Sequence, residues 1–239
     1  DGEVVNKVNA SNRKGLNRVT WNLRYPNERP INPDAIRGRG GRGGGWYNMG
    51  ALAAPGQYTA TLYKEAEGII SMLDGPINFN VVDLQRGTLK GVSYEDYRNH
   101  TENIISTQNR LSDISNKLSE SIKSVNAMRL ALSRSKVEIN ELSKQLYDLD
   151  EELNKLNTIM NGNSAKSEIG ERNNPSVNSY IGNAMRGLSS TYGPTGQHKQ
   201  SLNIAESMLN KMSVEIEKVI SKIEPLKTEL SKIDAPYII

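Results

Sequence analysis

The sequence contains no cysteine and few large aromatic residues, with two tryptophans and a single phenylalanine among 239 residues. Without cysteine the chain can form neither a disulfide framework nor a thiolate metal site. The lack of cysteine does not indicate a cellular compartment. It also lacks any apolar run near the ~18 residues that a membrane-spanning helix needs. We therefore expect no transmembrane segment.

Histidine is scarce too, since only His100 and His198 occur. A zinc site needs several ligands at fixed spacing, and these two residues do not form the pair four apart that places ligands on one helix face. We expect both to be ordinary solvated residues on helices, and we predict no metal and no cofactor.

The net charge of +3 comes from the first part of the chain. Residues 1–90 contain 12 basic and 8 acidic residues, whereas residues 91–239 contain 18 basic and 19 acidic residues. A nucleic-acid-binding protein usually carries a basic stripe along one element. The later segments instead mix both signs, as solvated helix faces do. We predict no nucleic-acid partner.

Composition changes near residue 90, which predicts two domains, 1–90 and 91–239. In the first, alternating side chains predict strands at about 17–24, 57–64 and 77–83, with a turn near Gly68 or Asp74-Gly75 joining the last two. Glu3 to Val8 alternates in the same way after the turn dipeptide Asp1-Gly2. We interpret 1–90 as an incomplete immunoglobulin-like (Ig-like) β-sandwich whose N-terminal strand or strands lie outside this sequence.

From Ser93, a helix-capping residue, the apolar period becomes helical, and Gly162 is expected to cap the end of the second helix. Three apolar stripes repeat at this period: Ile104, Leu111, Ile114, Leu118, Ile122, Val125, Met128 and Leu132; Leu142, Leu146, Leu149, Leu153, Leu156 and Met160; and Leu202, Ala205, Leu209, Met212, Ile216, Val219, Ile223, Leu226, Leu230 and Ile233. Helices are predicted at about 93–134, 136–160, 176–188 and 196–233, the polar stretch from Ser164 to Asn174 is predicted to be a loop, and Pro225 is expected to kink the last helix. The first would be about 40 residues long and span ~60 Å. Long amphipathic segments joined by turns favour an antiparallel bundle, so the fold class is α+β with two domains.

A glycine-rich segment between the first two predicted strands is the one candidate binding element, with Arg37, Arg39, Arg42, Trp46 and Tyr47 as partner-binding residues. It resembles an Arg-Gly-Gly RNA-binding tract with stacking aromatics, but a flexible inter-strand loop is the simpler interpretation. It lacks the Gly-Lys-Ser/Thr ending of a phosphate-binding loop.

Catalytic patterns are missing. No Gly-x-Ser-x-Gly string marks a nucleophile. The carboxylate pairs Glu151-Glu152 and Glu65 with Glu67 are expected on exposed surfaces, whereas a glycosidase needs opposed acids in a cleft. We predict no catalytic residue in this segment.

Two strand motifs are similar to those of a known family: Asn17-x-x-x-Trp21-x-Leu23-Arg24-Tyr25-Pro26 and, after the glycine-rich loop, Pro55-Gly56-Gln57-Tyr58-Thr59. The chain resembles the C-terminal region of bacterial sortilin-like (VPS10-type) β-propeller proteins of the Bacteroidota type, often labelled BNR-repeat glycosyl hydrolases. The resemblance implies an Ig-like domain and a helical region after a propeller. It also implies an extracytoplasmic location, at the cell surface or in the periplasm of a Gram-negative bacterium, or secretion.

The resemblance and the lack of catalytic patterns together predict a non-catalytic support or interaction module for an upstream propeller, including a subunit role in an outer-membrane assembly. Two alternatives remain open. The whole protein is a hydrolase acting on glycans or peptides with its active site in the propeller, or the chain is a stand-alone coiled-coil adhesion or interaction protein. The family's Asp-box string is absent here, so no functional residue is carried over.

Overall fold

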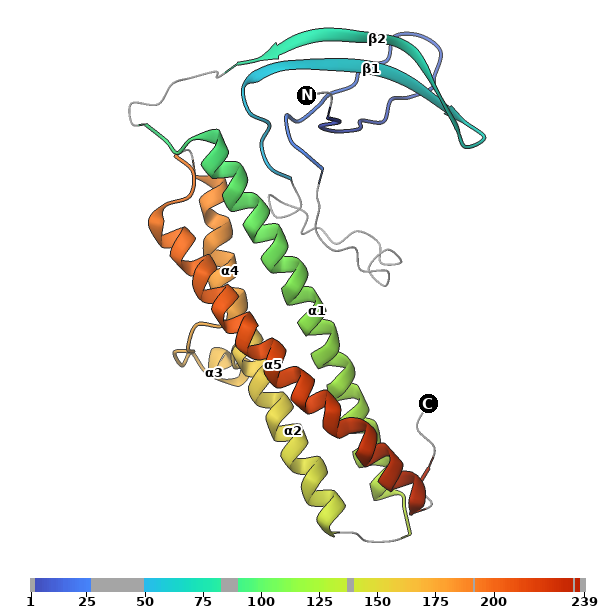
Figure 1. Cartoon of the computed structure of the whole chain (residues 1–239), viewed down its shortest axis with the longest axis vertical. Helices are drawn as coiled ribbons and strands as arrows, with labels where there is room; N and C mark the ends of the chain where they lie inside the picture. The colour runs from blue at the N-terminus through green and yellow to red at the C-terminus, as the bar shows by residue number, and fades with distance from the viewer. Residues whose placement is uncertain are drawn as a thin grey trace. The chain divides into compact units, whose positions relative to one another are not determined.

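The computed structural model describes residues 3–26, 50–82, 90–136, 140–190, 192–233 and 235–236. In these ranges the chain forms one two-stranded antiparallel sheet and a set of helices (Figure 1). It divides into two compact units, with the boundary between Asn99 and His100 near the start of the first long helix. The presence of both a small antiparallel sheet and long helices agrees with the predicted α+β class.

The sheet is a hairpin of β1 (Gly56–Ala66) and β2 (Ile69–Val81). Glu67 and Gly68, both with positive φ, form the turn, which is one of the two predicted positions. The other, Asp74-Gly75, lies inside β2, where the register shifts near Leu62. Gly75 has a φ of 103°, and a Cβ there would lie 2.8 Å from the Ala60 carbonyl oxygen. The strand must therefore carry glycine at this irregular point.

The predicted strands at 17–24 and 3–8 are wrong. Within the described ranges, the first makes only an isolated bridge, between Arg24 and Leu52, and 3–8 has no ladder at all. Leu23 takes a left-handed φ of 56°, and the Arg24 amide donates to Asn22 Oδ1 (3.2 Å), which turns the chain. Alternation describes side-chain faces, but a strand also needs a hydrogen-bonded neighbour.

An aromatic cluster holds residues 17–26 against the hairpin. The Trp21 ring meets Tyr58 edge-on at 5.4 Å and Phe79 at 6.2 Å, and Tyr58 stacks on Phe79. The Tyr58 hydroxyl donates to the Ala54 carbonyl (2.6 Å), while Trp21 Nε1 donates to the Arg24 carbonyl (2.9 Å). Burial raises the pKa of Tyr58, with a smaller contribution from Tyr25. The described part of this unit thus has only a small core.

The helices are α1 (Tyr94–Ser133), α2 (Asn140–Asn161), α3 (Ser164–Glu168), α4 (Val177–Arg186) and α5 (Gly196–Lys232), with a short 3-10 turn at Gly187–Ser189. Their ends follow local capping rules. Ser93 Oγ accepts from the Asp96 amide (3.1 Å) before α1. Ser176 and Ser179 cap each other at the start of α4. Gly162, with φ of 87°, follows α2 as a C-terminal cap.

The predicted apolar stripes form the core. The α2 stripe is fully buried, and so is the α5 stripe apart from half-buried Ile233 at its end. In α1, Leu111, Ile122 and Leu132 are only partly buried. The largest fully buried aliphatic side chains are Ile104, Met128, Leu146, Leu149, Leu153, Met160, Leu209 and Ile216.

The helices run in two directions. Side chains on α1 meet side chains on α5 at a constant separation of 100 residues, Arg110 with Asn210 and Lys117 with Glu217, so these two helices are parallel. The helix α2 is antiparallel to both (Figure 1). The ion pair Arg129–Asp150 (2.8 Å) joins it to α1, and the pair Lys222–Glu152 (2.6 Å) joins it to α5. The bundle is therefore only partly antiparallel, as Figure 1 shows.

The parallel pair is possible because α4 continues in the direction of α2 instead of reversing it (Figure 1). Asn178 Nδ2 donates to Asn161 Oδ1 (2.7 Å), joining the start of α4 to the end of α2. Between them the chain makes an excursion that contains α3, so the predicted loop at 164–174 is wrong in its first residues. Asn163 Oδ1 caps this short helix by accepting from the Lys166 amide, a local signal for a helix start.

Replacing Leu153 by alanine tests the core. Leu153 is 0% exposed, so L153A should lower the free energy of unfolding by about 2–5 kcal/mol. Leu130, 51% exposed on α1, is the matched control, and L130A should change stability by about 0.5 kcal/mol or less. Urea denaturation followed by helical circular dichroism measures both. Equal effects of the two variants would contradict the described packing.

Candidate functional site

The β1–β2 hairpin carries the largest group of exposed apolar side chains in the described part of the chain. Seven residues on its two strands are each at least half exposed: Leu62, Tyr63, Ile69, Ile70, Met72, Leu73 and Ile77. Single exposed apolar residues are normal on protein surfaces, but a contiguous group is typical of a surface that another protein segment contacts. We name these seven residues the hairpin surface.

Strand pairing places these side chains on both faces of the ribbon. Tyr63 lies opposite Met72 and Glu65 opposite Ile70, which puts Met72 and Ile70 on one face. The intervening pairs, Lys64 with Ser71 and Ala66 with Ile69, lie on the other face. Nearer the strand ends, Tyr58 opposite Phe79 is covered by Trp21. The part around the turn has no such cover among the described residues.

A hairpin with these properties is incomplete by itself. Two-stranded hairpins are marginally stable in water and need further strands or a packed helix. Their outer edges carry backbone groups that can pair with another strand. The hairpin surface therefore fits a role in contacting another protein segment.

The predicted partner-binding residues Arg37, Arg39, Arg42, Trp46 and Tyr47 all lie outside the described residues. Side-chain alternation does not predict the hairpin surface, because Ile69 to Leu73 shows no strict alternation. Apolar residues on both faces of a strand that is not buried are the signal that could have revealed it.

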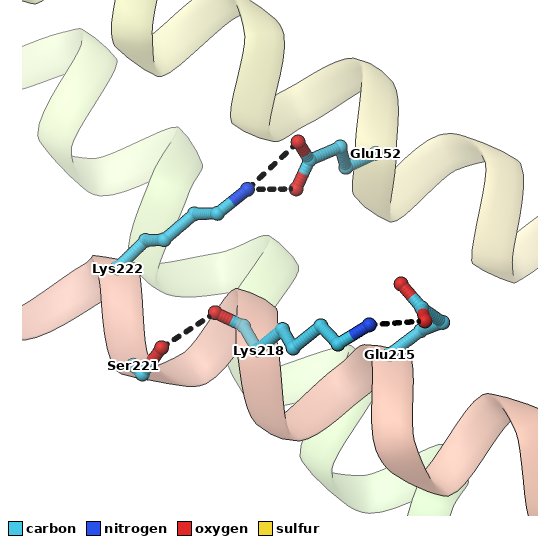
Figure 2. Close-up of polar contacts among 5 residues, drawn as sticks. All are labelled: Glu152, Glu215, Lys218, Ser221 and Lys222. Atoms are coloured by element: carbon cyan, nitrogen blue, oxygen red, sulfur yellow. Dashed lines mark hydrogen bonds and ion pairs between the residues drawn. The ribbon is translucent and has the colours of Figure 1, made fainter.

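The predicted carboxylate pairs do not form a site. Glu152 accepts from Lys222 Nζ at 2.6 and 2.8 Å, joining α2 to α5, and Lys218 pairs with Glu215 on α5 alone (Figure 2). Glu151, the neighbour of Glu152 and also on α2, is exposed. Glu65 lies in β1 and Glu67 in its turn. Exposed pairs of this kind contribute under about 1 kcal/mol each.

A shallow hollow of about 470 Å³ lies beside the Lys222–Glu152 pair, where Pro225 interrupts the helical hydrogen bonds of α5. The helix nevertheless continues through Pro225 to Lys232. The buried leucines Leu149 and Leu226 form part of its lining, together with the carboxylates of Asp148, Glu152 and Glu229. In the described chain no buried polar group is directed into this hollow, so we assign no catalytic or ligand-binding residue to it.

His100 is not the solvated residue that the sequence predicted. It is 4% exposed, and its Nε2 lies 3.1 Å from the Ala184 carbonyl oxygen of α4. Burial lowers its pKa, and the nearby Lys199 and His198 lower it further, against the opposing effect of the Ala184 hydrogen bond. His198 is half-buried, and its Nδ1 accepts from the Thr195 amide (3.1 Å) as a cap of α5. Both histidines therefore have structural roles.

The described ranges contain no group of three or more histidine, aspartate or glutamate residues arranged to hold a metal ion. None of the described helices has the length and apolar character to cross a membrane.

Comparisons with protein-family models, with curated proteins and with solved structures give no significant match to this chain. Its function must therefore be argued from its own surface.

The buried His100 is expected to make the free energy of unfolding depend on pH. Its folded pKa is lowered from 6.5, so between the folded pKa and about 6.5 the unfolded chain binds a proton that the folded chain does not. Stability should fall as pH decreases from about 6.5 to the folded pKa, by up to about 1.4 kcal/mol per pH unit.

Urea titrations of wild type and H100Q over this pH range test the effect. Glutamine does not titrate there, so the variant should have a shallower slope. Identical slopes in the two proteins would show that His100 does not cause the dependence.

Proposed function

We propose that this chain is a non-catalytic support and interaction module, in which the hairpin surface contacts another protein segment and the helical bundle acts as a stiff support. The observation that carries this proposal is the contrast between the two units. The bundle buries its own apolar stripes, while the hairpin leaves seven large apolar side chains at least half exposed.

The resemblance to sortilin-like propeller proteins suggests the partner. We propose that the hairpin belongs to an Ig-like sandwich and that it contacts an upstream propeller of the same polypeptide. The location would be extracytoplasmic, at a Gram-negative cell surface, with surface or outer-membrane proteins as further partners. Trp21 and Tyr58 lie in the two motifs of that resemblance and pack with Phe79 of β2, and this aromatic cluster supports the proposal of a sandwich core.

A second candidate function, hydrolysis of glycans or peptides, rests on the family label alone and would place the active site upstream. The third, a stand-alone coiled-coil adhesion protein, requires apolar stripes open to partner chains. Burial of Leu153, Leu209 and Ile216 within one chain supports a self-contained bundle instead.

The first experiment is peptide mapping of the natural polypeptide, to find whether a propeller precedes Asp1. The upstream region and the present chain, produced separately, should then bind each other in isothermal titration calorimetry. Binding should show a negative heat-capacity change, because apolar surface is buried.

The double variant I70T/M72T should weaken this binding tenfold or more, since it truncates two neighbouring side chains of one hairpin face. Threonine keeps a high strand propensity. The matched control is K64Q/S71T, a cross-strand pair on the opposite face, which should bind like wild type. Unchanged binding of I70T/M72T, or a natural polypeptide that lacks any upstream region, would contradict the proposal.

A further inference from the structure

The turn formed by residues 11–18 presents an apolar side chain with no cover. Leu16 is 97% exposed, the largest exposed fraction among the large apolar residues of the described ranges. Asn17 Nδ2 donates to the carbonyls of Arg13 (2.7 Å) and Gly15 (3.1 Å), and the Arg13 amide donates to Ser11 Oγ (3.2 Å). Gly15, with φ of 112°, permits the reversal. The turn thus has a defined shape that owes nothing to Leu16.

Positive charge surrounds this leucine in the sequence. Arg13, Lys14 and Arg18 are exposed, and no acidic residue occurs between Glu3 and Glu28. In the described ranges none of these three cations forms an ion pair with a carboxylate. We name Arg13, Lys14, Leu16 and Arg18 the basic turn.

We propose that the basic turn is a peripheral contact site for an anionic lipid surface. Leu16 enters the boundary between headgroups and acyl chains, while the guanidinium and ammonium groups of Arg13, Lys14 and Arg18 bind headgroup phosphates. This site lies on a different segment from the hairpin surface and does not depend on the function proposed for it.

A lipid surface fits the two features better than a soluble polyanion does. Cations alone suffice to neutralise a nucleic-acid backbone, which offers no apolar environment to an aliphatic side chain. An anionic membrane offers both phosphate and an apolar layer, and peripheral binding scales with both contributions. The hydrogen bonds of Asn17 hold the turn before contact, which reduces the entropy lost on binding.

The expected contributions are measurable. One Lys or Arg near an anionic surface raises the binding constant by a factor of about five, so removing three should lower it on the order of 100-fold. Replacing Leu16 by serine should lower it about tenfold or more. Salt should weaken the electrostatic part of the binding.

Co-sedimentation of the whole chain with phosphatidylcholine vesicles, with and without phosphatidylglycerol, tests the proposal. Wild type should bind only the vesicles that contain phosphatidylglycerol, and both R13Q/K14Q/R18Q and L16S should bind them less. The controls are K123Q/K144Q/K211Q, which removes the same charge from exposed positions on helices, and L130S, which removes an exposed leucine from α1. Circular dichroism melting confirms that each variant folds.

Equal loss in the controls, or no binding of wild type to phosphatidylglycerol vesicles, would overturn the proposal. Duplex DNA and polyglutamate serve as competing probes for a nucleic acid and an acidic protein. If either binds as tightly as the anionic vesicles and L16S has no effect, the basic turn is an electrostatic contact and the lipid assignment is wrong.

Discussion

The burial of aliphatic stripes within one bundle is the constraint on which the rest of the helical unit depends. With no disulfide and little aromatic material, its stability must come from packing Leu, Ile, Val and Met side chains along α1, α2 and α5. Most of these aliphatic side chains lie in the core, and the outer helix faces are mainly charged and polar, with Leu130, Tyr147 and Val214 among the exposed exceptions.

Polar contacts determine how the helices align with one another more than they contribute to stability. The exposed ion pairs in Figure 2 contribute little free energy, yet the contacts between α1 and α5 repeat after seven residues and fix a parallel register. At the end of the bundle near His100 the aliphatic core is smaller, formed by Ile104, Ala184 and Leu202. There a buried imidazole and its bond to Ala184 replace aliphatic packing, which makes this end sensitive to protonation.

Structural features that depend on residues close together in the sequence are predicted well. The stripe of α2, the capping serine Ser93 and the glycine after α2 all follow from side-chain period or backbone geometry within a few residues. Strand positions depend on distant partners, and alternation alone located only some of them. The predicted strand at 57–64 lies within β1 and most of 77–83 lies at the end of β2, but residues 17–24 turn at Leu23. Ile69 to Leu73 does not alternate and nevertheless lies in β2. His100 could not be assigned as buried because its cover comes from α4, more than 80 residues away. The apolar residues of the hairpin surface can be found in the sequence, but only the structure shows that they are exposed.

The central claim is that the hairpin has no cover among the described residues, while the bundle buries its own apolar stripes. Native-state amide hydrogen exchange, resolved by residue, measures this directly. The account predicts slow exchange along the buried stripes of α2 and α5, and much faster exchange along β1 and β2, since an uncovered two-stranded hairpin opens readily. Protection of β1 and β2 equal to that of α5 would mean that the hairpin is already covered within the chain, and it would contradict the account.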